Sequence, residues 1–330
     1  MTQTIKVGIL GYGNIGRGVE LSLLQNPDME LVAIFTRRAP ETLKVISKDV
    51  KVVHVDNINE YKDSIDVLIL CGGSATDLPV QGPKYASCFN CVDSFDTHAR
   101  IPEYFAIMDD ACKKAGKAAV ISAGWDPGLF SINRMMLEAI LPNGQNYTFW
   151  GKGVSQGHSD AVRRVKGVKK AVQYTIPLED AITRIRSGEQ PDLATGERHL
   201  RECFVVPEEG TDTTVIENTI INMPNYFADY KTIVHFISEE EFDKNHNKMP
   251  HGGFVIRSGN TGENNGHKQI VEFSLNLESN PEFTASILVA YARAVVKLNA
   301  RGKSGALTVF DIPPAYLSPK SPEKLRKEFL

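Results

Sequence analysis

The amino-terminal segment contains the pattern that most restricts how this chain can fold. An apolar, β-branched run at residues 4–10 leads into three glycines with the spacing GxGxxG, and residues 17–25 then have a helical pattern. In such a unit the first glycine permits a tight turn, the second admits a pyrophosphate close to the backbone, and the third lets helix and strand pack closely. The helix amino terminus adds N–H groups that face the anion. The context predicts a dinucleotide-binding loop made of Gly11, Tyr12, Gly13, Asn14, Ile15 and Gly16.

A second apolar strand lies at residues 31–35. It ends at the position where this fold places the residues that bind the adenosine ribose. An NAD enzyme places Asp or Glu there, about 20 residues past the glycines, to bind the ribose 2′-hydroxyl. This chain instead has Thr36, Arg37 and Arg38. Because the nearest acids precede the strand, we expect both guanidinium groups to be free to bind a 2′-phosphate in a forked geometry. The sequence therefore favours NADP as the cofactor, with a solvated turn as the alternative interpretation of the two arginines.

Composition limits the class of protein. With 330 residues, 42% of them apolar, the chain can bury a large core, and we expect two domains. The net charge is −3 and no basic run with interleaved aromatic residues occurs, so nucleic acid is not an expected partner. No apolar stretch approaches the length of a membrane span, and no signal-like segment precedes the first strand. We therefore expect a cytoplasmic protein with no membrane partner.

The cysteines indicate reduced thiols. Five of them are scattered along the chain, an odd number that does not suit a disulfide framework. Cys88 and Cys91 have CxxC spacing, but they lie in an expected strand, where residues three apart point to opposite faces. Because no second pair completes a metal site, we predict structural thiols and no metal.

Strands and helices alternate in the first part of the chain. Strand patterns at residues 52–55, 66–70, 88–92 and 117–121 are interspersed with helical stretches near 78–87 and 101–115. This alternation predicts an α/β fold, a Rossmann-type doubly wound parallel sheet. We assign the NADP-binding domain to residues 1–126.

Beyond residue 126 the pattern changes. A helix at residues 129–141 is followed by β-rich patches at 147–150, 203–206, 231–236 and 269–273. They suggest an antiparallel sheet with helices, so we expect an α+β substrate-binding domain at 127–280. Residues 281–330 contain an amphipathic helix that we expect to pack back on the first domain.

Two aspartates follow expected parallel strands, whose carboxyl ends form the edge where cofactor and substrate should meet. Asp96 and Asp126 there would suit a cationic ammonium substrate, although a cap or turn role is the alternative for either one alone. Trp125 adjoins Asp126 in a glycine-flanked turn, where it can wall a nicotinamide pocket. The further cofactor contacts expected at these strand ends are Cys71, Gly72, Gly73, Ser74, Ala75, Thr76, Ser94, Ala123 and Gly124.

The second domain offers three candidates. Residues 150–160 form a polar, glycine-rich loop that can bind a carboxylate through backbone N–H groups, with a flexible hinge as the alternative. Arg201 can clamp a carboxylate in a bidentate geometry, although an ordinary surface arginine is the simpler interpretation. His251 lies in a constrained loop without partners at metal-ligand spacing.

Together these stretches resemble the meso-diaminopimelate dehydrogenase family, NADP-dependent amino-acid dehydrogenases of lysine biosynthesis, over essentially the whole chain. The motifs that carry the resemblance are GYGNIGR (11–17), FTRRA (35–39), CGGSATDLP (71–79), GWDPGLFSINR (124–134), TFWGKGVSQGHSDA (148–161), VKKAVQYT (168–175), CFVV (203–206), MPHGG (249–253) and NPEFTAS (280–286).

The resemblance implies reversible oxidative deamination at the D-centre of meso-2,6-diaminopimelate, which gives L-2-amino-6-oxopimelate and ammonia. It implies that Asp96 and Asp126 lie near the amino group of the D-centre; which of them takes the ammonium proton stays open. It further implies a homodimer, with dimerisation through the second domain. The remaining substrate contacts that it implies are Ser155 and Gln156 at the D-end carboxylate, Thr175, Arg201, His251 and Asn280 at the L-end, and Trp150 and Asp160 as pocket walls.

Other functions are compatible with the same residues. Another NADP-dependent enzyme on this fold, such as a dihydrodipicolinate reductase or a sugar dehydrogenase, would act on a ring imine or an alcohol without ammonia. An acyl-enzyme aldehyde dehydrogenase needs an activated cysteine, and no cysteine here has an evident histidine partner in sequence. A non-catalytic NADP sensor would need no carboxylates at the nicotinamide.

Overall fold

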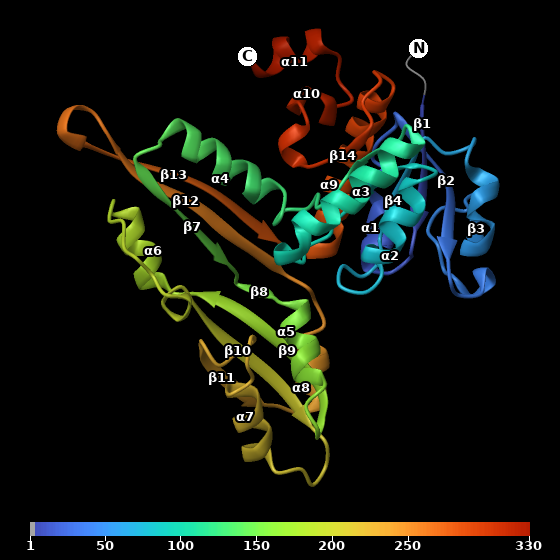
Figure 1. Cartoon of the computed structure of the whole chain (residues 1–330). Coiled ribbons are helices and arrows are strands. Elements are labelled where there is room, and N and C mark those ends of the chain that lie inside the picture. The colour runs from blue at the N-terminus through green and yellow to red at the C-terminus, as the bar shows by residue number, and fades with distance from the viewer. Residues whose placement is uncertain (1–3) are drawn as a thin grey trace. The chain divides into compact units, whose positions relative to one another are not determined.

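The computed structural model describes residues 4–330, and the chain forms two compact units (Figure 1). The first unit runs to Ile132 and resumes at Pro281–Leu330, and the second comprises Asn133–Asn280. The helix α4 (Leu129–Ile140) contains the first boundary, and α9 (Asn280–Asn299) begins at the second. No helix among residues 4–330 is long and apolar enough to cross a membrane.

The first unit contains a seven-stranded sheet in the order β14-β6-β5-β4-β1-β2-β3, and every neighbouring pair is parallel. This confirms the predicted Rossmann-type doubly wound sheet, with its change of direction between β1 and β4. Ligands of such sheets bind beyond the carboxyl ends of the strands at this change of direction. The strands are β1 (Ile5–Leu10), β2 (Met29–Thr36), β3 (Lys51–His54), β4 (Val67–Leu70), β5 (Asn90–Asp93), β6 (Ala118–Val120) and β14 (Gly305–Leu307).

Helices cover this sheet, and its strands are correspondingly apolar on both faces. All four residues of β4 are fully buried, as expected for a central strand of a two-sided parallel sheet. The remaining helices of this unit are α1 (Asn14–Leu23), α2 (Leu78–Ala86), α3 (Ile101–Ala115), α10 (Pro314–Leu317) and α11 (Pro322–Phe329).

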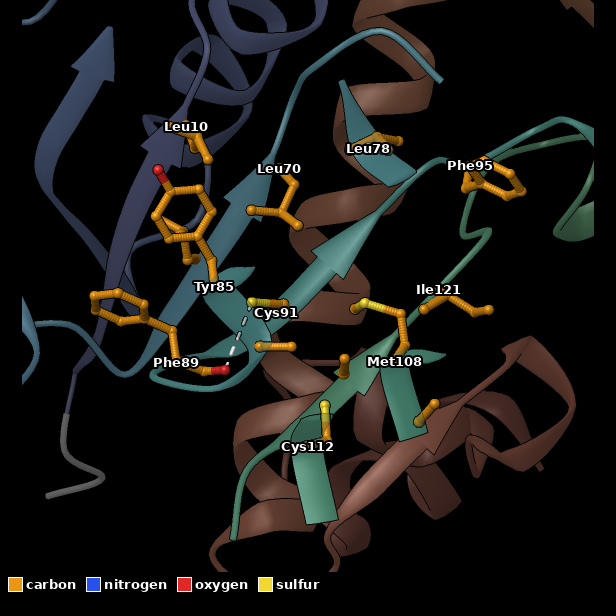
Figure 2. Close-up of a cluster of buried hydrophobic side chains, with 14 of the residues drawn as sticks. Leu10, Leu70, Leu78, Tyr85, Phe89, Cys91, Phe95, Met108, Cys112 and Ile121 are labelled. Atoms are coloured by element: carbon orange, nitrogen blue, oxygen red, sulfur yellow. Dashed lines mark hydrogen bonds between the residues drawn. The ribbon is translucent and has the colours of Figure 1, made fainter. Parts of the chain in front are cut away.

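One part of the core packs α2 and α3 against the sheet (Figure 2). Leu10 of β1 and Leu70 of β4 meet Tyr85 of α2 and Met108 of α3 in this cluster. Figure 2 also shows the sulfur atoms of two buried cysteines, from β5 and α3, among apolar side chains. Burial raises the pKa of both thiols, which makes them poor nucleophiles.

The CxxC pair differs from the prediction in one respect. Cys88 precedes β5, which begins at Asn90, so only Cys91 lies in the strand. All five cysteines of the chain are free thiols. Cys203 in the second unit is also buried, and desolvation raises its pKa to about 12.

The second unit contains two sheets rather than the single antiparallel sheet suggested by the sequence. One has the order β11-β10-β9-β8 and includes a parallel pair, β10 with β11, and the other has the antiparallel order β13-β12-β7. Its strands are β7 (Gly144–Trp150), β8 (Gly153–Val154), β9 (Val168–Pro177), β10 (His199–Pro207), β11 (Lys231–Phe236), β12 (His251–Thr261) and β13 (His267–Leu277). Its further helices are α5 (Gln156–Arg163), α6 (Glu179–Arg186), α7 (Thr213–Ile221) and α8 (Glu239–Asn245).

An ion pair between the buried Arg293 and the partly exposed Asp28 holds α9 within the first unit. Arg293 is only 2% exposed, and its guanidinium donates to both carboxylate oxygens of Asp28, at 2.6 and 2.9 Å. It also donates to Asn26 Oδ1 and to the Leu317 carbonyl, at 2.7 and 2.8 Å. Arg293 therefore joins α9 to the turn before β2 and to the carboxyl-terminal segment.

Removing this guanidinium should destabilise the first unit. Arg293→Met leaves the Asp28 carboxylate, which is 28% exposed, without its main partner, and the loss of these charged hydrogen bonds should cost about 1.5–3 kcal/mol of unfolding free energy at pH 7. The control is Lys114→Met, which breaks an exposed pair with Asp110 at 2.6 Å and should cost less than about 0.5 kcal/mol. Urea unfolding of both variants measures the difference; similar losses would contradict the assigned role.

The loss of unfolding free energy in Arg293→Met should also depend on pH. Hydrogen bonding from Arg293 lowers the pKa of Asp28 below its ordinary value of 3.8. A carboxyl whose folded pKa is depressed stabilises the fold above its unfolded pKa and loses that contribution as pH falls. The difference in unfolding free energy between Arg293→Met and the parent protein should therefore shrink as pH falls below about 4, and the part due to the bonds with Asn26 and Leu317 should remain.

Candidate functional site

The glycine loop has the geometry that its sequence predicts. Gly11 has a φ of +91°, a conformation that favours glycine, and a Cβ on Gly16 would lie 2.1 Å from the Gly11 carbonyl oxygen. By contrast, a Cβ on Gly13 would meet nothing within 4 Å. The middle glycine therefore leaves open space beside the amino terminus of α1, as a bound pyrophosphate requires.

The buried side chain of Glu20 in α1 forms a hydrogen bond with the glycine loop. Its carboxylate accepts hydrogen bonds from the Tyr12 hydroxyl and from the backbone N–H groups of Ile46 and Ser47, the latter two at 3.0 and 2.6 Å. These bonds lower the pKa of Glu20 against the effect of its burial. The glycine loop and the segment after β2 are thus tied to one ionised group.

The structure corrects the expectation that both arginines after β2 are free. Arg37 forms a two-pronged ion pair with Asp77, with Nη1–Oδ1 and Nη2–Oδ2 distances of 2.9 and 3.3 Å. Arg38 donates from Nη2 to the Tyr12 carbonyl at 2.6 Å, and its backbone N–H donates to Thr36 Oγ1 at 3.1 Å. The reason is that Asp77, which is distant in sequence, follows β4, the strand on the other side of β1.

Asp93, at the end of β5, organises the two loops that carry Asp96 and Asp126. Its Oδ1 accepts from the N–H groups of Phe95 and Ser122, at 2.9 and 3.0 Å, and its Oδ2 accepts from the Tyr104 hydroxyl at 2.8 Å. β5 and β6 are neighbours in the sheet, so the loops that follow them begin side by side. Asp93 itself is fully buried.

The expected contacts after β4 and β5 are also linked. The Ser74 hydroxyl accepts from the backbone N–H of Asp96 at 2.8 Å, which joins the segment of residues 71–76 to the first candidate acid. The Asp96 residue is exposed, whereas Ser94 is half-buried.

The turn that carries the second acid is tight, as predicted. Gly124 and Gly128 are bridged, and a Cβ on Gly128 would lie 1.7 Å from the Gly124 carbonyl oxygen. Trp125 is 7% exposed and packs edge-on against Phe130, with ring centroids 5.2 Å apart. Ala123 is buried and Asp126 is half-buried.

In the second unit, Arg201 is buried rather than on the surface. It is 7% exposed, donates from Nη1 to Thr175 Oγ1, and lies over the Tyr230 ring at 4.0 Å from the centroid. Its Nε is buried and has no hydrogen-bond partner, and no ion pair joins it to a carboxylate among residues 4–330. Burial lowers the pKa of Arg201. An unmatched buried cation of this kind is suited to a carboxylate ligand.

The glycine-rich segment after Trp150 is only partly a loop. Ser155 precedes α5, and Gln156 and Asp160 lie within that helix, which corrects the expectation of a loop through residue 160. Gln156 Nε2 lies 3.1 Å from the Met249 sulfur, and Asp160 pairs with Arg163. The backbone N–H groups expected to bind a carboxylate are thus those of a helix amino terminus.

Two neutral histidines support this region. His158 Nδ1 lies 2.8 Å from Ser155 Oγ, and His199 Nε2 accepts from the Trp150 backbone N–H at 2.8 Å. Burial, with the nearby charge of Arg201, lowers the pKa of His158 to about 4 and that of His199 to about 3. Both imidazoles are therefore uncharged at neutral pH.

The last two expected contacts lie at the ends of elements. His251 is the first residue of β12, and its Nδ1 accepts from the Gly252 backbone N–H at 2.8 Å. Asn280 is the first residue of α9, and its N–H donates to the Met249 carbonyl at 3.0 Å. No group of His, Cys, Asp or Glu side chains that could hold a metal ion occurs in the described part of the chain.

Sequence reasoning missed several supporting residues. Asp77 had a recognisable signal, because an Asp before Leu-Pro is typical of a helix amino terminus. Asp93 and His158 lay inside stretches already singled out, but their roles depend on contacts with other loops. Tyr230 had no local signal, since it meets Arg201 only through the pairing of β10 with β11.

Comparison with known proteins identifies the family. Residues 124–279 match the family model described as the diaminopimelic acid dehydrogenase C-terminal domain. The meso-diaminopimelate D-dehydrogenase of Ureibacillus thermosphaericus is 66% identical over 326 residues, which cover 99% of each chain.

Solved structures agree with this match. A structure described as C. glutamicum DAP dehydrogenase in complex with DAP has a TM-score of 0.92 and 47% identity, with complete coverage of both chains. An engineered D-amino acid dehydrogenase bound to NADP+ has a TM-score of 0.87 and 45% identity, over 99% of this chain and 100% of that one. This chain therefore belongs to the meso-diaminopimelate D-dehydrogenase family.

Proposed function

We propose that this protein catalyses the NADP-dependent, reversible oxidative deamination of meso-2,6-diaminopimelate at its D-centre, a reaction of lysine biosynthesis. The products are L-2-amino-6-oxopimelate and ammonia. The observation that carries the proposal is Arg201, a buried guanidinium with an unpartnered Nε, in a chain 66% identical to a named meso-diaminopimelate D-dehydrogenase. The alternative of another Rossmann oxidoreductase is not favoured, because identity of this level extends over 99% of the chain.

We propose that the first unit is the NADP-binding domain. The open space beside Gly13 suits the pyrophosphate, and Thr36, Arg37 and Arg38 offer a hydroxyl and two cations to the 2′-phosphate. When bound, NADP accepts the hydride that leaves the D-centre carbon. The further cofactor contacts in this proposal are Tyr12, Asn14, Ile15, residues 71–76, Ser94, Ala123 and Gly124, all on the glycine loop, α1 or the segments that follow β4, β5 and β6.

Asp96 and Asp126 are the proposed catalytic residues. Carboxylates there would bind the ammonium group of the D-centre and receive its proton, directly or through water, as the amine is oxidised to an iminium. Water then attacks the iminium carbon and ammonia leaves. The buried Asp93 carboxylate supports this role, because its bonds fix both loops at the same edge of the sheet. Trp125 would pack beside the reacting centre.

The second unit is the proposed substrate-binding and dimerisation domain. Ser155 and Gln156, at the amino terminus of α5, would bind the D-end carboxylate. Arg201 would bind the L-end carboxylate through its unpartnered Nε, in the forked, bidentate geometry that a guanidinium offers to a carboxylate. Thr175, His251 and Asn280 would complete the L-end contacts, and Trp150 and Asp160 would wall the pocket.

We further propose a cytoplasmic homodimer. Three exposed apolar side chains of α4, those of Met135, Met136 and Ile140, are 46, 48 and 71% exposed, and Val271 of β13 is 41% exposed. Exposed apolar side chains on one helix are compatible with an interaction surface there. Sedimentation equilibrium of the full chain tests the dimer.

The proposed reaction has a direct assay. The purified protein with NADP+ and meso-diaminopimelate should raise the absorbance of reduced nicotinamide, and the reverse reaction should require ammonia. L,L-diaminopimelate, which has no D-centre, is the control substrate and should give no signal. Turnover of an alcohol without any response to the meso compound would contradict the proposal.

Arg37→Ala should weaken NADP binding. Losing a charged hydrogen bond of about 1.5–3 kcal/mol raises the dissociation constant by about one to two orders of magnitude. Arg100→Ala, which removes an exposed arginine paired with Glu103 in the same unit, should leave it unchanged. Titration calorimetry with NADP+ measures both; equal affinity in Arg37→Ala and the parent protein would refute the assignment.

Arg201→Met should separate substrate binding from stability. Loss of the charged clamp, about 1.5–3 kcal/mol, should raise KM for meso-diaminopimelate by about 10- to 100-fold while NADP affinity is kept. Because the guanidinium is buried without a carboxylate, its replacement should not lower Tm. Arg186→Met, at an exposed pair with Glu272, is the surface control. If Arg201→Met bound neither meso-diaminopimelate nor NADP, the variant would instead have lost its folded structure.

A further inference from the structure

The ion pair between Arg37 and Asp77 lies at the proposed 2′-phosphate position. Arg37 follows β2 and Asp77 precedes α2, and both belong to the first unit. Two guanidinium nitrogens face the two carboxylate oxygens, at 2.9 and 3.3 Å. A phosphate would use the same forked donor geometry. In this structure a carboxylate therefore occupies donors that the proposed coenzyme needs.

We propose that Asp77 is an affinity-determining residue that competes with the coenzyme 2′-phosphate for Arg37. This inference rests on the proposed NADP dependence and adds a role for an acid outside the site residues named above. Binding of the 2′-phosphate exchanges one anionic partner of the guanidinium for another. Asp77 thereby reduces NADP affinity in two ways: it must release Arg37, and its charge repels the bound phosphate.

The contacts of Asp77 make this exchange feasible. The Arg37 side chain is 69% exposed, so its pair with Asp77 is solvated and weak. Asp77 Oδ2 also accepts from the Gly73 backbone N–H at 3.0 Å, at the start of α2. The carboxylate can therefore release Arg37 and keep its own position.

Arg38 provides an internal comparison. Its guanidinium donates to the uncharged carbonyl of Tyr12, and Arg38 forms no ion pair with a carboxylate in the part of the chain that the structure describes. A carbonyl does not repel a phosphate as a carboxylate does. The competition is thus specific to Arg37, and neutralising Asp77 should affect only ligands that carry the 2′-phosphate.

Asp77→Asn tests the proposal. The amide oxygen can still accept from Gly73, while the negative charge is lost. The variant should bind NADP+ and adenosine 2′-monophosphate about three- to tenfold more tightly than the parent protein, with NAD+ affinity changed less than twofold. The gain should shrink at high salt, which screens exposed charges. Asp77→Ser, another residue favoured at helix starts, should behave in the same way.

The matched control is Asp110→Asn, which removes the same charge from an exposed pair with Lys114 on α3. It should leave all three affinities unchanged. Titration calorimetry on the full chain measures these affinities and distinguishes a failure of this inference from a failure of the proposed NADP dependence. If both Asp77 variants bind the 2′-phosphate ligands equally or more weakly than the parent protein, Asp77 is no competitor and the inference is overturned. If the parent protein binds neither 2′-phosphate ligand but reduces NAD+, the proposed NADP dependence fails instead.

Discussion

The buried carboxylate of Asp93 is the constraint on which the arrangement of the candidate acids depends. It is fully buried, and desolvation raises its pKa, while hydrogen bonds from Phe95, Ser122 and Tyr104 oppose that rise. Ser122 has a φ of +56°, which is unfavourable for a residue with a side chain, and its N–H is one of these donors. A buried carboxyl that lost such donors would carry a large desolvation penalty. The loops after β5 and β6 are therefore held together by a group that cannot easily be replaced.

Charge matching has the same importance in the second unit. Arg201 is buried, and the histidines His158 and His199 nearby have pKa values lowered to about 4 and about 3, so they add no positive charge at neutral pH. An uncompensated buried charge is costly, and a protein keeps one only where a ligand or a partner provides the opposite charge. The proposed substrate carries two carboxylates, and we propose that one of them neutralises Arg201. It also carries two ammonium groups, and we propose that Asp96 and Asp126 of the first unit bind one of them.

The sequence predicted the first unit well because its signals are local. The glycine spacing directly determines a turn and a close helix approach, and strand and helix patterns alternate clearly up to β6. The prediction for Arg37 was incomplete because its partner Asp77 is brought to it only by the sheet order, in which β1 lies between β2 and β4. Distance along the sequence therefore did not predict which acidic side chain forms the ion pair with Arg37. The coenzyme preference inferred from Thr36, Arg37 and Arg38 agrees with the NADP+-bound relative, but the free guanidinium groups do not exist in the structure.

The second unit was harder to predict because its elements depend on tertiary pairing. The run before Arg163 is polar and glycine-containing, which favours a loop by propensity, yet α5 forms there because Val162 is buried and the Ser159 hydroxyl bonds to the backbone N–H of Gln173 in β9. In the same way, no local pattern distinguishes Arg201 from a surface arginine. Its burial follows from the pairing of Arg201 with Thr175 across β10 and β9, together with the Tyr230 ring that covers it. Residues whose surroundings are set by partners from distant strands can be located only once the strand order is known, and in this chain they include Arg201, which we propose as a substrate ligand.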